Sequence, residues 1–374
     1  SQPEIWKDCR KGIGWGWYYR HHIMSKLITV NYIVRNGGEY VRFFWDSLKK
    51  QTYQDFEAHI WDNNSTDNTR NTIKAEYPEF ILHESKENIG VWAAFEKLLR
   101  SSTSKYVICM TDVILKEDFL EKAIAIMEAN PNCGALQAKV YQMNLYGQLE
   151  TRNYKLETNL IDTCGFKIFK SRKVINLGHG EEDREQFDNI SEIFGVEGVV
   201  PIFRREALES CHITPRGSTA RWLIDPDYRI GPLGYGDDLD LAWRMRLFGW
   251  KQIFAPNVIA YHDRSTTKGY SKSFKDYFKR VKERQKIDII KRRLDWRNVR
   301  FTIIKNDYII NILKDLPYIL IREIGVLGYT VLFEPEVLSE IVNFMKYLPK
   351  MIKNRKTIME KAKLKPSEIK VWFL

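Results

Sequence analysis

The chain has 374 residues, and 44% of them are hydrophobic, which is enough to form a sizeable core and excludes wholesale disorder. The five cysteines are odd in number and form no C-x-x-C pair, a pattern that favours a reducing compartment over a disulfide framework. The net charge of +11 is concentrated at one end, where residues 264–374 hold 26 lysines and arginines against 12 aspartates and glutamates. An anionic surface, either a membrane or a nucleic acid, is the natural partner for this third of the chain.

Three regions are expected along the chain. Residues 1–23 are rich in glycine, tryptophan and tyrosine, show no regular period or signal-peptide pattern, and are treated as an N-terminal extension of unknown role. Residues 24–265 form the expected catalytic domain, and residues 266–374 form a basic amphipathic helical region.

From residue 27 onward, apolar strand-like segments alternate with amphipathic helix-like segments. The expected strands are residues 27–34, 56–62, 80–85 and 106–113, and the expected helices between them are residues 39–51, 67–76 and 90–101. Such alternation predicts an α/β fold in which a mostly parallel sheet has helices on both faces. Ligands bind these sheets at the carboxyl ends of the strands. Polar residues follow the expected strands at that edge: Asn36, the run of residues 62–69, Asn88 and Asp112.

Two of these polar positions indicate chemistry. Asp62 opens the run DNNSTDNT, where a carboxylate can accept the ring N–H of a pyrimidine base, although the same run equally suits a helix N-cap. Asp112 follows the apolar run YVICMT. A carboxylate at a strand end suits Mg²⁺ or Mn²⁺, which bind through few protein ligands and substrate phosphates, and the alternative is a solvated turn residue.

Acidic residues also precede an amphipathic helix near residue 240. Asp237 and Asp238 can be N-caps that gain from the helix dipole, or one of them can be a general base held against an acceptor hydroxyl. Asp240, one turn into the helix, is expected to be structural. His262 ends the strand-like run FAPNVIAYH, and a lone histidine is by itself more often structural than a ligand.

The C-terminal region combines basic residues with apolar runs. Residues 270–300 predict a basic helical stretch. The apolar run at 308–333 is interrupted by Lys314, Asp315, Pro317, Arg322 and Glu323. These interruptions argue against a membrane-spanning helix and favour one that lies in the membrane interface. Because the basic residues interleave with long aliphatic runs, a lipid surface is favoured over a nucleic acid.

Nine sequence blocks follow one another between about Lys26 and Arg264. They are RNGGEYV (35–41), WDNNSTDNT (61–69), ENIG (87–90), TDVIL (111–115), DTCGFKIFKSRKV (162–174), GHGEEDREQFD (178–188), FGVEGVVPIFRREAL (194–208), DDLDLAWRMRLFGW (237–250) and APNVIAYHDR (255–264). Together they resemble the family-two glycosyltransferases, which have a GT-A fold. They are most similar to the bacterial rhamnosyltransferases that build cell-wall and surface polysaccharides.

The resemblance implies a role for each candidate residue. The residues that would bind the nucleotide-sugar are Asn36, Asp62, Asn64, Asn88, Gly90 and Asp112. Asp62 would hold the base, and Asp112 matches the second acid of the family's D-x-D metal motif. His262 matches a histidine that can complete the metal and diphosphate site. Asp238 matches the catalytic base, with Asp237 where the family usually has glutamate.

Three features depart from the family pattern. Met110 stands where the first acid or asparagine of the D-x-D motif is usual, so Asp112 is expected to hold the metal without a second acid. Glu197 replaces the small residue that is usual between two glycines, and the segment between Asp225 and Tyr235 is longer than usual and lacks a double phenylalanine. These departures bear on the sugar and the acceptor pocket more than on the reaction.

The resemblance implies an inverting, metal-dependent sugar transfer from a nucleotide-sugar. The expected donor is dTDP-L-rhamnose, with a UDP-hexose as the alternative, and the expected acceptor is a saccharide on a polyprenyl diphosphate carrier. The basic region would keep the enzyme at an anionic membrane, peripheral on the cytoplasmic face of the plasma membrane. A nucleotidyltransferase is less favoured because no basic glycine-rich loop lies near the first strand, and a nucleic-acid-binding protein is also less favoured.

Overall fold

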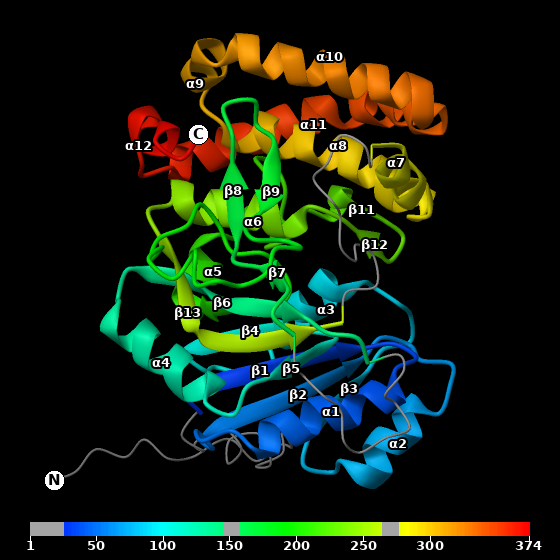
Figure 1. The fold of residues 1–374 in the computed structure, drawn as a ribbon, viewed down its shortest axis with the longest axis vertical. Coiled ribbons are helices and arrows are strands. Elements are labelled where there is room, and N and C mark those ends of the chain that lie inside the picture. The colour runs from blue at the N-terminus through cyan, green and yellow to red at the C-terminus, as the bar shows by residue number, and fades with distance from the viewer. Residues whose placement is uncertain (1–25, 146–157, 264–276) are drawn as a thin grey trace, which may run out of the picture.

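The computed structural model describes residues 26–145, 158–263 and 277–374. The expected N-terminal extension, residues 1–23, and the expected domain boundary at residue 265 lie outside the described residues. Within the described residues, the α/β architecture is confirmed (Figure 1).

A mixed sheet of nine strands forms the centre of the described part of the chain, in the order β3–β2–β1–β4–β10–β6–β13–β5 with β7 paired to β6. The strands are β1 (Ile28–Val34), β2 (Phe56–Asp62), β3 (Ile81–Glu84), β4 (Tyr106–Met110), β5 (Val113–Leu115), β6 (Cys133–Gln142), β7 (Ile161–Thr163), β10 (Ile202–Arg204) and β13 (Lys251–His262). Strands β3, β2, β1 and β4 are parallel, whereas β10 is antiparallel to both β4 and β6. The carboxyl ends of β1, β2 and β4 therefore meet at one edge.

Helices cover the sheet on both faces. Those that precede the C-terminal region are α1 (Gly38–Lys49), α2 (Thr69–Glu76), α3 (Val91–Leu98), α4 (Phe119–Ala129), α5 (Arg205–Ser210) and α6 (Asp237–Leu247). Every residue of β1 is buried, as is typical of a central parallel strand covered on both faces. Its successive side chains Tyr32 and Ile33 enter two different apolar clusters, which lie on opposite faces of the sheet.

Two short hairpins lie outside the main sheet. One is formed by β8 (Phe166–Ile168) and β9 (Val174–Asn176), and the other by β11 (Arg229–Ile230) and β12 (Leu233–Gly234). The second hairpin is the segment that departs from the family pattern. Asn298 of the C-terminal region holds it in place, because the Asn298 side-chain amide donates to the carbonyl oxygens of Tyr228 (2.8 Å) and Tyr235 (2.7 Å).

The C-terminal helices pack onto the rest of the fold. They are α7 (Tyr277–Gln285), α8 (Ile289–Asn306), α9 (Ile309–Lys314), α10 (Leu316–Phe333), α11 (Glu340–Lys361) and α12 (Pro366–Lys370). Arg172, which lies between β8 and β9, is fully buried against them. It pairs with Asp307 (Nε to Oδ2, 2.7 Å) and Asp315 (Nη1 to Oδ2, 2.8 Å), and its guanidinium lies 3.8 Å from the ring centroid of Phe373. These helices therefore share a core with the sheet.

Part of the positive charge of this region is used inside the fold. Arg297 is 2% exposed and pairs with Glu340 at 2.9 Å, and Lys305 is fully buried and pairs with Asp225 at 2.8 Å. Buried cations are tolerated when they are paired in this way. The sequence excess of positive charge thus overstates what is free to meet an anionic surface.

Helix α10 lies on the outside of the C-terminal layer (Figure 1). Pro317 lies in the first turn of α10, where a backbone N–H would have no partner within the helix. A new helix therefore begins at Leu316, within the apolar run. Arg322 and Glu323 lie within this helix and pair with each other at 2.6 Å. In the described part of the chain, α10 is the one helix long and apolar enough to cross a membrane, by length and composition alone.

Candidate active site

Two cavities adjoin at the carboxyl edge of the sheet. The strand-end cavity has a volume of ≈ 800 Å³ and lies over the ends of β1 and β4. The α6 cavity has a volume of ≈ 490 Å³ and lies over the start of α6. The residues that line both are Val91, Thr111, Asp112, Pro232 and Leu233. Asp112 therefore stands where the two cavities meet, and the β11–β12 hairpin forms part of the wall of each.

Four of the expected nucleotide-sugar residues line the strand-end cavity: Asn36, Asn88, Gly90 and Asp112. Asn36 has a positive φ of 51°, and its Oδ1 accepts a hydrogen bond from the N–H of Thr66 (2.8 Å), which fixes the loop after β1. Gly90 has a φ of 81°, and a Cβ there would lie 2.4 Å from the carbonyl oxygen of Pro232. Glycine is therefore required where this loop meets the β11–β12 hairpin.

Asp62 and Asn64 do not line either cavity. Asp62 is fully buried, and its carboxylate accepts hydrogen bonds from Arg70 Nε (2.8 Å) and from the N–H of Ser65 (3.2 Å). Asn63, between them, does line the strand-end cavity, and sequence reasoning did not single it out. Base binding by Asp62 stays a prediction, because its carboxylate already has partners here.

Asp112 and His262 come together from different strands. Asp112 lies between β4 and β5, and His262 ends β13, which pairs with β5, so His262 Nε2 lies 3.2 Å from Asp112 Oδ1. On its other side, His262 Nδ1 lies 2.8 Å from Oδ2 of Asp162, a fully buried residue of β7 that the sequence did not single out. Burial by itself lowers the pKa of His262, but the two carboxylates outweigh it and raise the pKa to about 10. Burial raises the pKa of Asp112, but His262 and the Thr111 hydroxyl outweigh it and hold that pKa below its usual value.

Asp112 and His262 fit a divalent cation whose other ligands come from a substrate. Among the described residues, no group of three or more histidine, cysteine, aspartate or glutamate side chains is arranged to hold a metal. Magnesium-type sites need few protein ligands when substrate phosphates supply the rest. Asp162 orients His262 from behind, as carboxylates do for histidines that bind metal through Nε2. A cation there would take the place of the His262 proton.

Asp237 and Asp238 begin α6 and both line the α6 cavity. Asp238 Oδ2 accepts from the N–H of Gly198 (3.0 Å) and Oδ1 from the N–H of Leu239 (2.8 Å), which fixes the carboxylate. Burial, together with the negative charge of Glu197, raises the pKa of Asp238 to about 6. Asp237 is 3% exposed, and burial raises its pKa well above the ordinary value. Asp238 is therefore better suited to accept a proton near neutral pH.

Asp240 faces the core, one turn further along α6. Its carboxylate lies 3.1 Å from both Lys305 and Arg244 and accepts a hydrogen bond from Asn306 (2.7 Å). Its expected structural role is confirmed.

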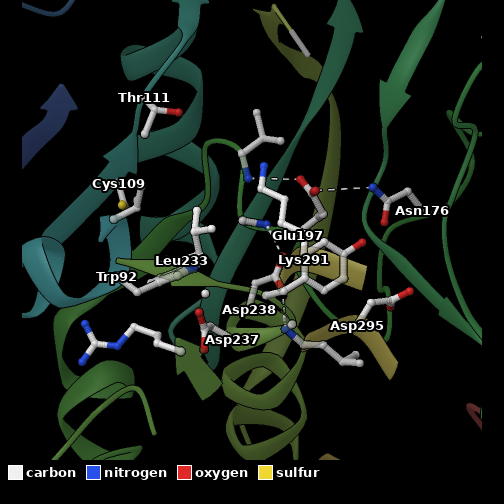
Figure 2. Close-up of a pocket in the computed structure, with 18 of the residues that line it drawn as sticks. Trp92, Cys109, Thr111, Asn176, Glu197, Leu233, Asp237, Asp238, Lys291 and Asp295 are labelled. Carbon is white, nitrogen blue, oxygen red and sulfur yellow. Dashed lines mark hydrogen bonds between the residues drawn. The ribbon is translucent and has the colours of Figure 1, made fainter. Parts of the chain in front are cut away.

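Glu197 lines the α6 cavity beside Asp238, although the sequence marked it only as a departure from the family pattern. It is 8% exposed. Its Oε2 accepts from the N–H of Val199 (3.1 Å), and its Oε1 accepts from the side-chain amide of Asn176 (3.4 Å). Figure 2 shows Glu197 and Asp238 in the same pocket, with Asn176 reaching Glu197 from β9. The sequence therefore indicated that Glu197 is unusual for the family. It did not indicate that Glu197 lies beside Asp238.

Helix α8 supplies a further wall of the α6 cavity. Lys291 and Asp295, one turn apart on α8, both line it (Figure 2). Asp295 pairs with Arg284 at 2.9 Å, whereas Lys291 has no ion-pair partner among the residues that the structure describes. The sequence showed only a basic helical stretch here, because the proximity of α8 to Asp238 depends on tertiary packing.

Residues 29–209 match the family described as Glycosyl transferase family 2. The match runs from β1 into α5 and includes Asp112 and Glu197. This segment is therefore similar to the family 2 glycosyltransferases. Asp238 and His262 lie beyond the matched segment, so the roles expected for them rest on the geometry of the cavities and on the sequence resemblance.

Known proteins similar to this chain include an uncharacterised glycosyltransferase of Rickettsia prowazekii (strain Madrid E), which is 32% identical over 87 residues. These residues are 23% of this chain and 27% of the relative, so the match spans about a quarter of that relative's length. The solved structure of S. aureus TarS aligns with a TM-score of 0.50 and 13% identity, covering 89% of this chain and 55% of TarS. The mannosyltransferase PcManGT from Pyrobaculum calidifontis, solved with GDP-Man and Mn²⁺, aligns with a TM-score of 0.44 and 15% identity over 92% of this chain and 87% of its own. At 13% identity the likeness to TarS concerns the fold alone, in agreement with the expected GT-A fold.

Proposed function

We propose that the protein is an inverting glycosyltransferase that moves a sugar from a nucleotide-sugar to a saccharide hydroxyl. The observation that carries the proposal is the junction at Asp112. There a cavity large enough for a nucleotide meets a second cavity that contains a carboxylate with a pKa of about 6. The match of residues 29–209 supports the same class of enzyme.

The proposed reaction is a single displacement at the anomeric carbon. The acceptor oxygen attacks this carbon while its O–H proton passes to Asp238. In the same step the bond between the carbon and the diphosphate oxygen breaks, and the nucleoside diphosphate leaves with the electron pair. Attack opposite to the leaving group inverts the anomeric configuration. A divalent cation, Mg²⁺ or Mn²⁺, held by Asp112 and His262 would supply positive charge for the leaving diphosphate.

The proposed donor is dTDP-L-rhamnose, and a UDP-hexose is the alternative. Both carry a pyrimidine base, and the amide side chains of Asn36, Asn63 and Asn88 give the strand-end cavity polar groups for base or ribose. Asp62 directly precedes Asn63, and its part in binding the base rests on the sequence resemblance, since its carboxylate is paired with Arg70. The choice of rhamnose rests on the sequence resemblance.

The proposed acceptor is a saccharide on a polyprenyl diphosphate carrier. Lys291 supports an anionic group on the acceptor, because this half-buried cation lines the α6 cavity and has no ion-pair partner in the described part of the chain. A phosphate one sugar away from the reacting hydroxyl would match a lysine at this wall.

The proposed location is the cytoplasmic face of the plasma membrane, with the protein peripheral to it. Helix α10 and its neighbours expose a continuous series of large apolar side chains. Those more than two-thirds exposed on α10 and at the start of α11 are Ile321, Ile324, Leu332 and Val342. Large apolar side chains exposed along an outer helix support a surface that enters the lipid interface.

The test is a screen of nucleotide-sugars, including dTDP-L-rhamnose, UDP-glucose and GDP-mannose, for release of the nucleoside diphosphate with Mg²⁺ or Mn²⁺. We expect turnover of one pyrimidine donor, and loss of that turnover in Asp238→Asn. The matched control is Asp188→Asn, because Asp188 lies outside both cavities and pairs with Lys139. Release of no nucleotide from any donor by the unaltered chain, with or without lipid-linked acceptors, would contradict the proposal.

A further inference from the structure

Glu197 is held firmly beside the proposed base. It belongs to the loop between Gly195 and Gly198, which packs directly on α6. A Cβ at Gly195 would lie 2.7 Å from the Cβ of Ala242, and one at Gly198 would lie 3.0 Å from Asp238 Oδ2. The two glycines thus let the loop approach α6 so closely that the Gly198 N–H reaches the Asp238 carboxylate.

The Glu197 side chain is held in place by its own contacts. Its backbone N–H donates to Gln137 Oε1 (2.7 Å), and its carboxylate accepts from Val199 and Asn176. At 8% exposure it faces the α6 cavity and not bulk solvent. A carboxylate fixed in this way keeps its negative charge close to Asp238 at little cost in side-chain entropy when the acceptor binds.

We propose that Glu197 is a positioning residue for the transfer, which strengthens Asp238 as a base. The inference deepens the proposed function and rests on it for the identity of the reacting group. A nearby negative charge makes a carboxylate hold its proton more strongly, and the pKa of Asp238 is raised in this direction by burial and by Glu197.

Other charged groups face Asp238 from the surrounding elements. Asp237 lies beside it on α6, Arg229 approaches from β11, and Lys291 and Asp295 approach from α8. The Arg229 guanidinium donates to the carbonyl oxygen of Ile89 (2.6 Å), which holds it against the loop before α3. Asp112 and His262 lie at the junction with the strand-end cavity. The charge of Glu197 is thus one of several near Asp238. To measure its effect on Asp238, a variant must remove this charge and leave the others in place.

The experiment compares Glu197→Gln with Glu197→Asp and with Glu206→Gln, a matched change at an exposed glutamate outside the cavities. The first readout is the pH dependence of donor hydrolysis, with water as the acceptor and dTDP-L-rhamnose or UDP-glucose as the probe. We expect the acidic limb to move to lower pH by about one unit in Glu197→Gln, to stay nearly in place in Glu197→Asp, and not to move in Glu206→Gln.

The second readout needs no activity. The carboxyl carbons of ¹³C-labelled aspartate are titrated by NMR, and the Asp238 signal is assigned by its absence in Asp238→Asn. An Asp238 titration that moves to lower pH in Glu197→Gln supports the inference even if no donor is turned over, a result that would contradict only the proposed function. An acidic limb and an Asp238 titration that both stay unchanged in folded Glu197→Gln would overturn the inference and leave the proposed function standing.

Discussion

A carboxyl group can act as a base near neutral pH only if its surroundings disfavour its charge. At Asp238, burial and the neighbouring Glu197 do this, while two backbone N–H groups hold the carboxylate in one orientation. Asp237 is 3% exposed, and burial raises its pKa well above the ordinary value. The adjacent acids thus differ in exposure, as their proposed separate roles require.

The pH dependence of the reaction follows from Asp238. A base must be deprotonated to act, so kcat/KM should fall as the pH drops through about 6 and reach a plateau above it. Asp238→Asn should lower kcat by about 10²–10⁴-fold and remove this acidic limb, with little change in donor affinity. Asp237→Asn should reduce kcat less and raise the KM of the acceptor. Steady-state kinetics over a range of pH checks both variants, and near-wild-type turnover of Asp238→Asn would reject Asp238 as the base.

The metal site should be sensitive to a residue that does not touch the metal. Asp162→Asn removes the charge that orients His262, and loss of such a partner typically weakens metal affinity by about 10–100-fold. Asp112→Asn should abolish the dependence of nucleoside diphosphate binding on Mn²⁺ altogether. Calorimetric titration of UDP and dTDP with and without Mn²⁺ measures both effects. Full activity of the unaltered protein in EDTA would show that no metal is needed.

At the scale of single elements, helix α8 connects the site to the C-terminal layer. It carries Lys291 and Asp295 into the α6 cavity, and Arg300 near its other end pairs with Glu323 of α10 at 2.5 Å. The β8–β9 hairpin is attached to the same layer through Arg172. The expected catalytic domain and the expected helical region are therefore joined by buried charges and not by a linker alone.

Arg172→Met tests this attachment. The change leaves Asp307 and Asp315 without their guanidinium partner inside the protein, and breaking a buried pair on one side costs about 3–5 kcal/mol. The control is Arg216→Met, which removes an exposed pair with Glu360 and should cost about 0–1 kcal/mol. Chemical denaturation of both variants measures the difference. Equal stability of the two would mean that the C-terminal helices contribute little to the fold.

At the scale of the whole molecule, α8 lines the α6 cavity through Lys291 and Asp295, whereas α10 forms the outer surface of the C-terminal layer (Figure 1). Since Arg297 and Lys305 are used in buried pairs, apolar contact should contribute more to membrane binding than the net charge suggests. A truncation near residue 270 would remove part of the core, so point variants are the better test.

Ile321→Glu combined with Ile324→Glu places two charges on the most exposed part of α10, where the side chains are 72% and 70% exposed. If these side chains enter lipid, binding to vesicles of phosphatidylcholine and phosphatidylglycerol should weaken by at least about tenfold. Val371→Glu is the matched control, because Val371 is 70% exposed but lies on another part of the surface. Sedimentation with vesicles measures binding, and equal binding by all three proteins would exclude α10 as the membrane contact.

The sequence by itself determined the α/β alternation, because a strand such as Ile28–Val34 is apolar at nearly every position and a helix such as Gly38–Lys49 is apolar on one face. It also determined which polar residues follow the strands. These residues meet at one edge because parallel strands bring their carboxyl ends together, whatever the details of packing. Asn36, Asn88, Gly90 and Asp112 could therefore be placed at this edge in advance, and all four line the strand-end cavity.

Only the tertiary structure decided which distant residues complete the site. Asp162 meets His262 across 100 positions of sequence, and Lys291 reaches the cavity of Asp238 because α8 packs on α6. It also decided that Asp62 is buried against Arg70 and that Arg297 and Lys305 are paired inside the fold. Local patterns report how a segment alternates between apolar and polar faces. They do not report which charge a buried side chain will meet, because that depends on how separate elements pack against one another.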